Sequence, residues 1–416
     1  MRDKLFLGLV LATGALSGCD KLWAWKLVDC PLSDSRCAGD GGADTPDLIG
    51  ADLAGSGGRE DLAGVDLLGS KPSFVSIAPT SVGGSQVLIG TNRGKVVSCE
   101  LSNAQNSEGV VLDAEDPGVR AVAARRFFDG GSQLVLAALS SGDVWKDVSG
   151  SGSSSERKLP SVLAGGWYES FESMYPNQRA FWVVGSGGLV ALRHSGDTMP
   201  ATWTTETTGV TSDLYAVTGV ANTQYMTYDP QKTRLYAVGA GGTVLERLSG
   251  TWASVPSIAN RPTTALYGVA VYSNDVAMPG FDMATGPSDF VWAVGEQGRL
   301  VRKRGTAWSA LPSGTIPTTV TLRAVFLNST TTGLAVGDRG AVYALGGNEA
   351  SPTWTEVVPP ASVGGVDPRT IHFTGLYYAY VNFQTSYYLV GSDSTVLRYV
   401  PPPTNMWQLI PCPSGQ

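Results

Sequence analysis

Five residues with potentially catalytic side chains recur at related places along the chain. Arg120, Arg323, Glu169, Tyr215 and Tyr267 lie in short apolar segments that repeat through the sequence. A glycosidase needs convergent arginines or paired carboxylates around a tyrosine or an acid. If the apolar segments line one channel, these side chains would supply that chemistry. A glycan-acting enzyme is therefore the alternative to the binding function that the rest of the sequence favours. Such positions more often serve as spacers, and we expect no catalytic residue.

The remaining chemistry-bearing residues predict neither a metal nor a cofactor. The two histidines, His194 and His372, are 178 residues apart, and the chain has no His-x-x-His or Cys-x-x-Cys spacing. No Gly-x-Ser-x-Gly or Gly-x-x-x-x-Gly-Lys-Ser/Thr motif occurs either. We expect both histidines to be solvated or structural.

The five cysteines divide into one lipidation candidate and two candidate disulfides. Leu16-Ser17-Gly18-Cys19 follows Arg2, Lys4 and an apolar run over residues 5–16, which is typical of a signal peptide. The four residues resemble the bacterial lipobox, and this resemblance implies a lipoprotein: cleavage after residue 18, and acyl chains such as palmitate on Cys19. An ordinary signal peptide or an N-terminal anchor helix is the alternative. We predict export and lipid anchoring to the cell membrane or the outer membrane.

Cys30, Cys37, Cys99 and Cys412 remain, an even number in an exported chain, so disulfides are expected. Three pairings are possible. We favour Cys30 with Cys37, and Cys99 with Cys412, because the second pair would join the first and last repeats described below. Two unpaired buried thiols are the alternative.

Residues 19–72 are predicted to form a flexible tether. Residues 38–72 hold seven acidic and two basic residues, which account for −5 of the net charge of −7. Asp47-Leu48-Ile49-Gly50 and three similar Asp-Leu units contain no aromatic residue, so they bury too little apolar surface to fold. A calcium-binding or partner-docking repeat is the alternative. No basic run occurs anywhere, which argues against nucleic-acid binding.

From residue 73 onward one signature repeats seven times: a short apolar strand, Gly, two or three turn residues, Gly, and a second apolar strand. The Gly residues permit positive φ in a hairpin between the two strands. Successive copies lie 42 to 56 residues apart, which is a propeller-blade period. The copies are anchored at Gly90, Ala138, Gly185, Gly239, Gly295, Gly337 and Gly391.

Two further strands complete each repeat. An earlier strand with a small third residue precedes each copy, as in Leu214-Tyr215-Ala216-Val217, with copies starting at Val119 in the second repeat and, blurred, near Tyr168 in the third. Five repeats end in a strand headed by tryptophan: Trp203, Trp252, Trp308, Trp354 and Trp407. We therefore predict an all-β, seven-bladed β-propeller over residues 73–416, with four antiparallel strands per blade.

The strand pair with a following Gly-Thr-x-Trp, as in Gly305-Thr306-Ala307-Trp308, resembles propellers of the photosystem II stability and assembly factor type. More distantly it resembles the BNR (Asp-box) repeats of sialidases. The resemblance covers about 340 residues and implies the fold. The complete Asp box, Ser-x-Asp-x-Gly-x-Thr-Trp, is missing, so no sialidase site is implied.

Blades 4 and 5 have longer connections between their first and second strands than the other blades. These connections are rich in aromatic and flexible apolar side chains, types that are enriched at interfaces. We predict a monomeric, non-catalytic binding or assembly module of the cell envelope that recognises a protein or glycan partner. Drift in surface loops is the alternative explanation of the insertions. The candidate binding residues are Tyr225, Met226, Tyr228, Met278, Phe281 and Met283.

Overall fold

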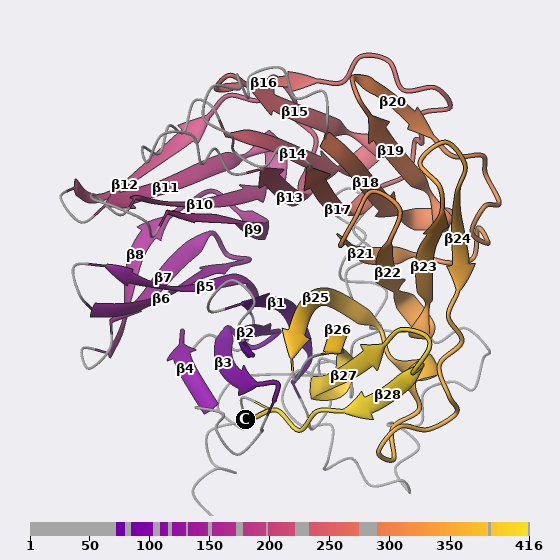
Figure 1. Ribbon diagram of the computed structural model, residues 1–416. Coiled ribbons are helices and arrows are strands. Elements are labelled where there is room, and N and C mark those ends of the chain that lie inside the picture. The colour runs from indigo at the N-terminus through magenta and orange to yellow at the C-terminus, as the bar shows by residue number, and fades with distance from the viewer. Residues whose placement is uncertain are drawn as a thin grey trace, which may run out of the picture. The chain divides into compact units, whose positions relative to one another are not determined.

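The computed structural model describes residues 72–79, 85–102, 109–114, 119–129, 132–148, 152–171, 178–196, 199–220, 233–273, 289–381 and 384–414. These residues form seven four-stranded antiparallel sheets, and the strands of each sheet are consecutive in the chain. The predicted all-β, seven-bladed propeller is thereby confirmed (Figure 1). Within the described part of the chain, no helix is long and apolar enough to cross a membrane.

The strands of each blade are numbered from the propeller axis outward. Blades 1 and 2 contain β1 (Phe74–Pro79), β2 (Gln86–Thr91), β3 (Lys95–Glu100), β4 (Gly109–Asp113), β5 (Ala121–Asp129), β6 (Ser132–Leu139), β7 (Asp143–Val148) and β8 (Gly152–Lys158). Blades 3 and 4 contain β9 (Val162–Phe171), β10 (Gln178–Gly185), β11 (Val190–Gly196), β12 (Met199–Glu206), β13 (Leu214–Val220), β14 (Arg234–Gly239), β15 (Val244–Leu248) and β16 (Thr251–Ser254).

The later blades follow the same order. Blades 5 and 6 contain β17 (Leu266–Ser273), β18 (Asp289–Gly295), β19 (Leu300–Arg304), β20 (Ala307–Ala310), β21 (Leu322–Leu327), β22 (Gly333–Gly337), β23 (Val342–Gly347) and β24 (Pro352–Glu356). Blade 7 contains β25 (Phe373–Val381), β26 (Gln384–Gly391), β27 (Thr395–Val400) and β28 (Met406–Leu409).

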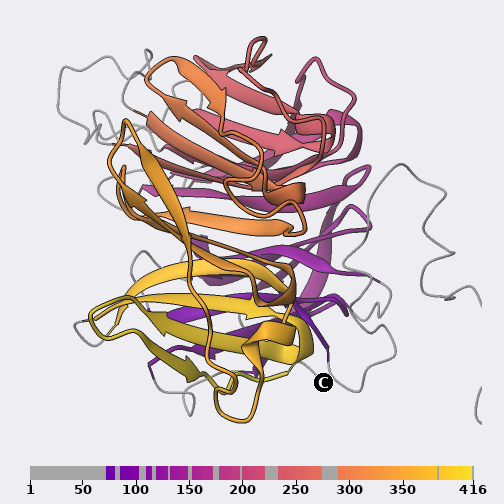
Figure 2. The ribbon, with the colours of Figure 1, turned by 90° about the vertical axis from the view of Figure 1, so that its right-hand side faces the viewer.

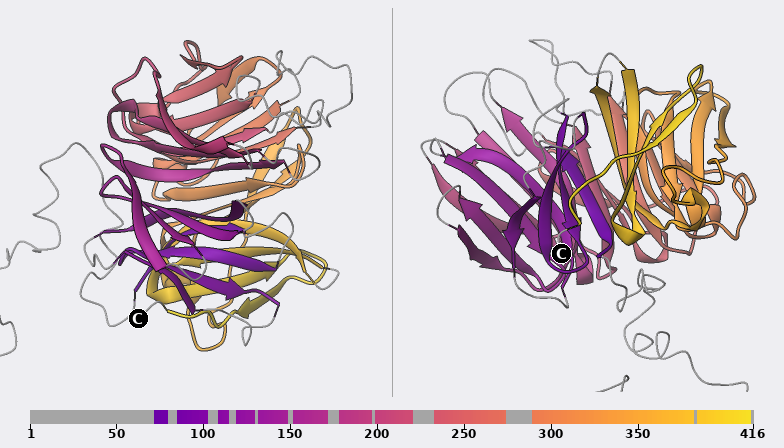
Figure 3. Two further views of the ribbon diagram at one scale, coloured as in Figure 1. Left: turned by 90° about the vertical axis from the view of Figure 1, so that its left-hand side faces the viewer. Right: turned by 90° about the horizontal axis from the view of Figure 1, so that it is seen from below.

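The sheets close into a ring. Each first strand contacts the first strand of the next blade, and β25 contacts β1. Figures 2 and 3 show the sheets stacked face against face around the ring. The buried apolar side chains accordingly divide into seven clusters, one at each junction between neighbouring blades. Because both faces of a sheet are covered, the second strands read as continuous apolar runs, and all six residues of β14 are buried.

Blades 3 to 7 join their second and third strands by a two-residue turn. In blade 3 the amide of Leu189 donates to the carbonyl of Ser186 (3.2 Å), and Gly187 and Gly188 have φ values of 65° and 76°. This is a type I′ turn, which matches the twist of an antiparallel hairpin and requires left-handed residues. The predicted glycine-hinged hairpins are therefore confirmed. We call the side of the ring that carries these hairpins the turn face.

The predicted register is wrong in blades 1 and 2. Strand pairing places Thr91 and Leu139 at the position that Gly239 holds in blade 4, one residue after the predicted anchors Gly90 and Ala138. In these two turns only the final residue, Gly94 or Gly142, is left-handed, whereas the turns of blades 3 to 7 each have two left-handed residues. The position equivalent to Gly239 accepts a side chain in blades 1 and 2.

The predicted first strands of blades 2 and 3 are also displaced. β5 begins at Ala121 rather than Val119, and the equivalent of Leu214 in blade 3 is Val162 rather than a residue near Tyr168. β9 is ten residues long, and its second half is rich in aromatic residues. The sequence pattern therefore places the start of the strand too late. With the corrected start, the third residue is Ala164, which keeps the small side chain predicted for that position.

Charged bridges hold three successive junctions. At the junction of blades 3 and 4, Glu206 accepts from Arg247 (2.8 Å, twice) and from the indole Nε1 of Trp252 (2.7 Å). Equivalent bridges are Glu156 with Arg193 and Trp203, and Glu246 with Lys303 and Trp308. The predicted outer-strand tryptophans of blades 3 to 5 therefore fix one blade to the next.

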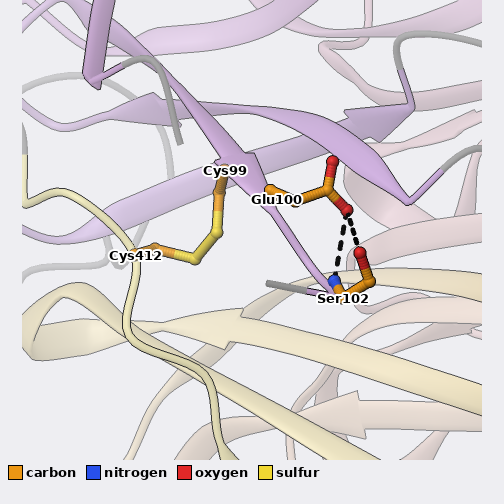
Figure 4. The surroundings of a disulfide bond; sticks show 4 residues. All are labelled: Cys99, Glu100, Ser102 and Cys412. Atoms are coloured by element: carbon orange, nitrogen blue, oxygen red, sulfur yellow. Dashed lines mark hydrogen bonds between the residues drawn. A yellow bond between two sulfur atoms is a disulfide. The ribbon is translucent and has the colours of Figure 1, made fainter. Parts of the chain in front are cut away.

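The ring closes without strand exchange in the described residues, because all four strands of blade 7 come from one end of the chain. Cys99 of β3 and Cys412 form a disulfide with a Cα–Cα distance of 5.4 Å, which is the pairing expected from their places in the first and last blades. Figure 4 shows this bond beside Glu100, whose Oε1 accepts from Ser102 N and Oγ (3.2 and 2.7 Å) and fixes the chain after β3. The disulfide thus supplies a covalent link across the seam.

Two hydrogen bonds supplement the disulfide at the seam. Thr374 Oγ1 donates to Phe74 O (2.7 Å), and Ser394 Oγ donates to Pro72 O (2.5 Å). Ser394 occupies the second left-handed position of its turn. The equivalent residue in blade 4 is Gly242, and a Cβ there would clash with the carbonyl oxygen of Pro262. At this one junction, the side chain itself makes the contact to the next blade.

Candidate binding site around the propeller axis

Every first strand carries a β-bulge at its second residue. The register shifts between Leu214 and Ala216 in blade 4 and at the equivalent place in the other six blades. A bulge leaves one residue unpaired and redirects its side chain. The first strands lie nearest the axis (Figure 1), so the seven bulge residues are arranged in a ring around it. The seven residues are Val75, Val122, Leu163, Tyr215, Tyr267, Arg323 and Thr374.

Three neighbouring bulge residues contact one another. The rings of Tyr215 and Tyr267 lie 5.3 Å apart between centroids, and the guanidinium of Arg323 lies 4.6 Å over the ring of Tyr267. This cation–π contact adds to the attraction between blades 5 and 6. Blades 1 to 3 instead present aliphatic bulge residues, so the ring has one polar, aromatic side and one apolar side.

The hairpin turns supply acids to this polar side. Tyr267 donates its hydroxyl to Glu296 Oε1 (2.5 Å), and Glu296 Oε2 accepts from Ala265 N (3.2 Å). Arg323 forms two hydrogen bonds to Asp338 (3.1 and 2.8 Å). Both acids are the first residues of their type I′ turns, so the backbone that builds the hairpin also positions the carboxylates.

His372 completes the group. Its Nδ1 lies 3.3 Å from Asp338 Oδ1, and it precedes the first strand of blade 7. We call Tyr215, Tyr267, Glu296, Arg323, Asp338 and His372 the axial cluster. Its members come from blades 4 to 7 and lie at the turn face.

Burial and ion pairing set the protonation of the axial cluster. Burial alone would raise the pKa of Asp338, but the hydrogen bonds and charges of His372 and Arg323 outweigh it and hold that pKa below its usual value. Asp338 in turn raises the pKa of Arg323 against the effect of burial. Burial and the nearby Glu296 raise the pKa of Tyr267, which therefore stays a neutral hydrogen-bond donor.

The structure brings together three of the five residues that the sequence predicts to line the axis. Tyr215, Tyr267 and Arg323 are bulge residues of adjacent blades, whereas Arg120 lies before β5 and Glu169 is the eighth residue of β9, paired with Ala180. Neither Arg120 nor Glu169 therefore occupies the matching bulge position that the sequence predicts, because the predicted strand starts in blades 2 and 3 are displaced. Glu296, Asp338 and His372 are not among the site residues predicted from the sequence, although Glu296 and Asp338 directly follow an anchor glycine.

His194 lies apart from the axial cluster. It is in β11 and pairs with Ala180 and Thr202, and burial lowers its pKa. In the described ranges, no group of three or more His, Cys, Asp or Glu side chains could hold a metal ion.

The predicted binding residues in the long connections of blades 4 and 5 lie outside the described residues. These residues are Tyr225, Met226, Tyr228, Met278, Phe281 and Met283. The strand ends that carry the two connections are described, and they lie opposite the turn face, since β13 and β17 start at the turns and run away from them. The lipidation candidate Cys19 and the predicted Cys30–Cys37 disulfide also lie outside the described part of the chain.

A buried ion pair joins these strand ends. Arg234, the first residue of β14, donates to both carboxylate oxygens of Asp289, the first residue of β18 (2.8 and 2.7 Å). The Tyr236 hydroxyl donates to the Asp289 carboxylate (2.6 Å), and the Arg234 guanidinium donates to Ser273 Oγ (3.3 Å). Arg234 and Asp289 are 1% and 0% exposed, so this pair is shielded from water and fixes the ends of both connections.

Comparison with known proteins supports the fold. No protein-family model matches the chain, and no curated protein is similar to it in sequence. Among solved structures, Sqt1 from Saccharomyces cerevisiae is 11% identical with a TM-score of 0.51, and the match covers 80% of this chain and 97% of that one. YCF48 from Cyanidioschyzon merolae is 14% identical with a TM-score of 0.51, and the match covers 80% of this chain and 96% of that one. At these identities the likeness shows the propeller fold alone.

Proposed function

We propose that this chain is a non-catalytic binding or assembly module of a bacterial cell envelope. It is held on a membrane by acyl chains on Cys19, works as a monomer, and recognises a partner protein or glycan at the turn face around the axial cluster. The observation that carries this proposal is the contact of three bulge residues, Tyr215, Tyr267 and Arg323, from adjacent blades. Aromatic residues and arginine are enriched at binding interfaces.

The axial cluster is organised before any partner arrives. Arg323 is held by Asp338, and Tyr267 is held by Glu296, so little side-chain entropy remains to be lost on binding. Around the cluster the turns expose Gln297 and Arg339, both in left-handed conformation with φ near 54° and 53°. These two side chains are therefore the outermost groups that a partner would meet.

The direct test replaces Gln297 and Arg339 together by glycine. Glycine keeps the left-handed turns, so the fold should remain while the exposed side chains disappear. We expect the double variant to lose most of the proteins or glycans that co-purify with the wild type from detergent-solubilised envelope. Ser249→Gly is the matched control, since Ser249 is exposed, has a φ of 47°, and lies in a hairpin of the opposite face.

An unchanged set of partners in the double variant would contradict recognition at the turn face. The long connections of blades 4 and 5 would then be the next surface to test, by shortening both to the length found in blade 6. Loss of partners in that variant alone would place recognition on the opposite face.

The lipid anchor is tested separately. The full-length chain with Cys19→Ala should fail to incorporate a labelled palmitate analogue and should leave the membrane fraction, because several acyl chains give nearly permanent attachment. A variant that stays in the membrane without label would support an N-terminal anchor helix instead.

A glycan-acting enzyme is the second candidate, and one contact favours it. Some glycosidases use a tyrosine as nucleophile, and Tyr267 donates to Glu296 beside Arg323. Against it, the raised pKa of Tyr267 makes its phenolate harder to form. Turnover of fluorogenic glycosides by the wild type and its loss in Tyr267→Phe would replace the non-catalytic proposal; we expect no turnover in either protein.

A further inference from the structure

A groove of about 590 Å³ lies at the outer rim of blade 7, away from the axial cluster. One wall of the groove is β28, the outermost strand of that blade, which Figure 1 shows in yellow at the edge of the ring. Its other side is the connection from blade 6 to blade 7, which contributes Val358, Pro360 and Ser362. Val358 is 71% exposed, more than Val110 (41%), the other exposed large hydrophobic residue among those that the structure describes.

The walls of the groove are fixed by local structure. Val363 and Val366 exchange two backbone hydrogen bonds (2.7 and 3.1 Å), which hold the connection in a tight loop. Gly364 in this loop, with a φ of 58°, lies so close to β28 that a Cβ there would be 2.9 Å from the Cβ of Leu409. The groove therefore exists before a ligand binds.

The lining is aromatic and polar but carries no ionisable side chain. Trp407 is half-buried and packs on Tyr399, with ring centroids 4.7 Å apart. Beside it, Asn405, Gln408 and Ser362 are exposed, and their side chains make no hydrogen bond to any described residue. Amides and hydroxyls of this kind both donate and accept.

We propose that this groove binds a neutral oligosaccharide. Sugar hydroxyls also donate and accept, so they match amide and hydroxyl side chains, and the apolar faces of sugar rings match an indole. A pocket of apolar and aromatic walls with a few uncharged polar groups is a typical small-ligand site, and its volume lies within the usual range for one. The absence of charge in the lining disfavours acidic sugars and charged peptides.

A second groove among the described residues lacks this combination. The groove of about 580 Å³ between blades 2 and 3 is lined by Lys146, Glu156, Arg157 and Arg193, and the Nε1 of its tryptophan, Trp203, already donates to Glu156 (2.8 Å). Trp407 has no such acceptor among the described residues, which leaves its indole N–H available to a ligand.

The test is calorimetric titration of the full-length protein in detergent with a panel of neutral hexose and N-acetylhexosamine oligosaccharides. We expect at least one member to bind, and Trp407→Ala to weaken its affinity by about tenfold or more. Because that variant also loses the contact with Tyr399, a second variant combines Gln408→Ala with Asn405→Gly. Both positions are exposed, and Asn405 has a φ of 45° that glycine keeps, so this variant should fold normally and still bind more weakly.

The matched control is Thr355→Ala, because Thr355 is exposed and follows Trp354 in blade 6 as Gln408 follows Trp407 in blade 7. It should bind like the wild type, and so should the Gln297→Gly, Arg339→Gly double variant of the turn face, which separates this groove from the proposed function. Lack of binding by every oligosaccharide at millimolar concentration would overturn the proposal. So would binding that the Gln408→Ala, Asn405→Gly variant leaves unchanged, or binding of a proline-rich peptide in the groove in place of the sugars.

Discussion

The two sides of the ring are held together by different interactions. From blade 2 to blade 5, each junction has an acid that bridges a basic side chain and a tryptophan of the next blade. From blade 6 to blade 1, the junctions rely on aromatic contacts, such as Phe326 on Tyr378, and on the Cys99–Cys412 disulfide. We call these the charged side and the aromatic side.

The comparison shows that one repeat position can serve two purposes. Trp203 and Trp407 lie in the outermost strands of their blades and pair with equivalent residues of the third strand. Glu156 engages the indole of Trp203, whereas no described acid engages that of Trp407. In blade 3, Glu206 points to the next blade, but the equivalent residue of blade 6 is Val357, which packs in an apolar cluster. A single acid therefore decides whether the indole N–H of a rim tryptophan fixes a junction or has no acceptor among the described residues.

The largest effect is expected on the charged side from Asp289→Ala. It removes the carboxylate that the buried Arg234 guanidinium contacts, and this should lower the free energy of unfolding by about 3–5 kcal/mol. Urea denaturation measures it. Replacing both residues, Arg234→Met with Asp289→Leu, should recover most of the loss, and a loss below about 1 kcal/mol in the single variant would show that water reaches the site.

On the aromatic side, the disulfide should dominate. Replacing Cys99 and Cys412 together by serine should lower stability by about 2–4 kcal/mol, because the unfolded chain regains the entropy of a long closed loop. The melting temperature of the wild type should fall on reduction, while that of the double variant should not respond to the reductant. Equal melting temperatures for wild type and variant without reductant would mean that noncovalent contacts alone close the ring.

Removing one bridging acid should have a smaller effect. Glu206→Gln keeps the size of the side chain but removes the carboxylate charge that faces the fully buried Arg247, at a cost of about 1–3 kcal/mol. Glu356→Gln in blade 6 is the matched control, because Glu356 is exposed and should change stability by less than about 0.5 kcal/mol. If both variants lose the same amount, the charged bridges do not distinguish the two sides.

The pH dependence of stability should come mainly from the charged side. Burial alone would raise the pKa of Glu156, but Arg193, the Trp203 N–H and Lys146 outweigh it, so the pKa lies below the ordinary 4.5. A carboxylate with a depressed folded pKa contributes stability that is complete above the unfolded value and is lost as the pH falls through the folded value. Stability should therefore decline below about pH 4.5, and the decline should be shallower in Glu156→Gln. An identical acid decline in both proteins would assign it to other carboxylates.

Much of this fold can be predicted from the sequence, because its hairpin turns restrict which residues they accept. A type I′ hairpin needs left-handed residues at fixed places, so a glycine recurs at the second of these places in blades 3 to 6, as at Gly188 and Gly242. Where the turn changes, as at Thr91 and Leu139, the signal shifts by one residue and the prediction loses register. Cys99 and Cys412 are predictable as a pair because a closed ring must bring the first and last blades together.

The axial cluster is only partly readable from the sequence. Tyr215, Tyr267 and Arg323 share a position in the repeat, but their acidic partners come from the turns. Glu296 and Asp338 follow anchor glycines, where an acid, a serine or an alanine is equally compatible with the hairpin, so the residue type alone gives no sign of the contact. The rim groove is still harder to predict from the sequence, because it depends on the close approach of the loop at Gly364 to Leu409 of β28.

The two uses of the rim tryptophan are tested most directly by urea denaturation of Trp203→Phe and Trp407→Phe side by side. Phenylalanine keeps an aromatic ring and removes only the indole N–H and part of the surface. Trp203→Phe should lose about 1–2 kcal/mol of unfolding free energy, since Glu156 then loses the hydrogen bond from the indole and keeps those from Arg193. Trp407→Phe should lose less than about 0.5 kcal/mol. Equal losses in the two variants would contradict the account, because Trp407 would then fix its blade just as Trp203 does.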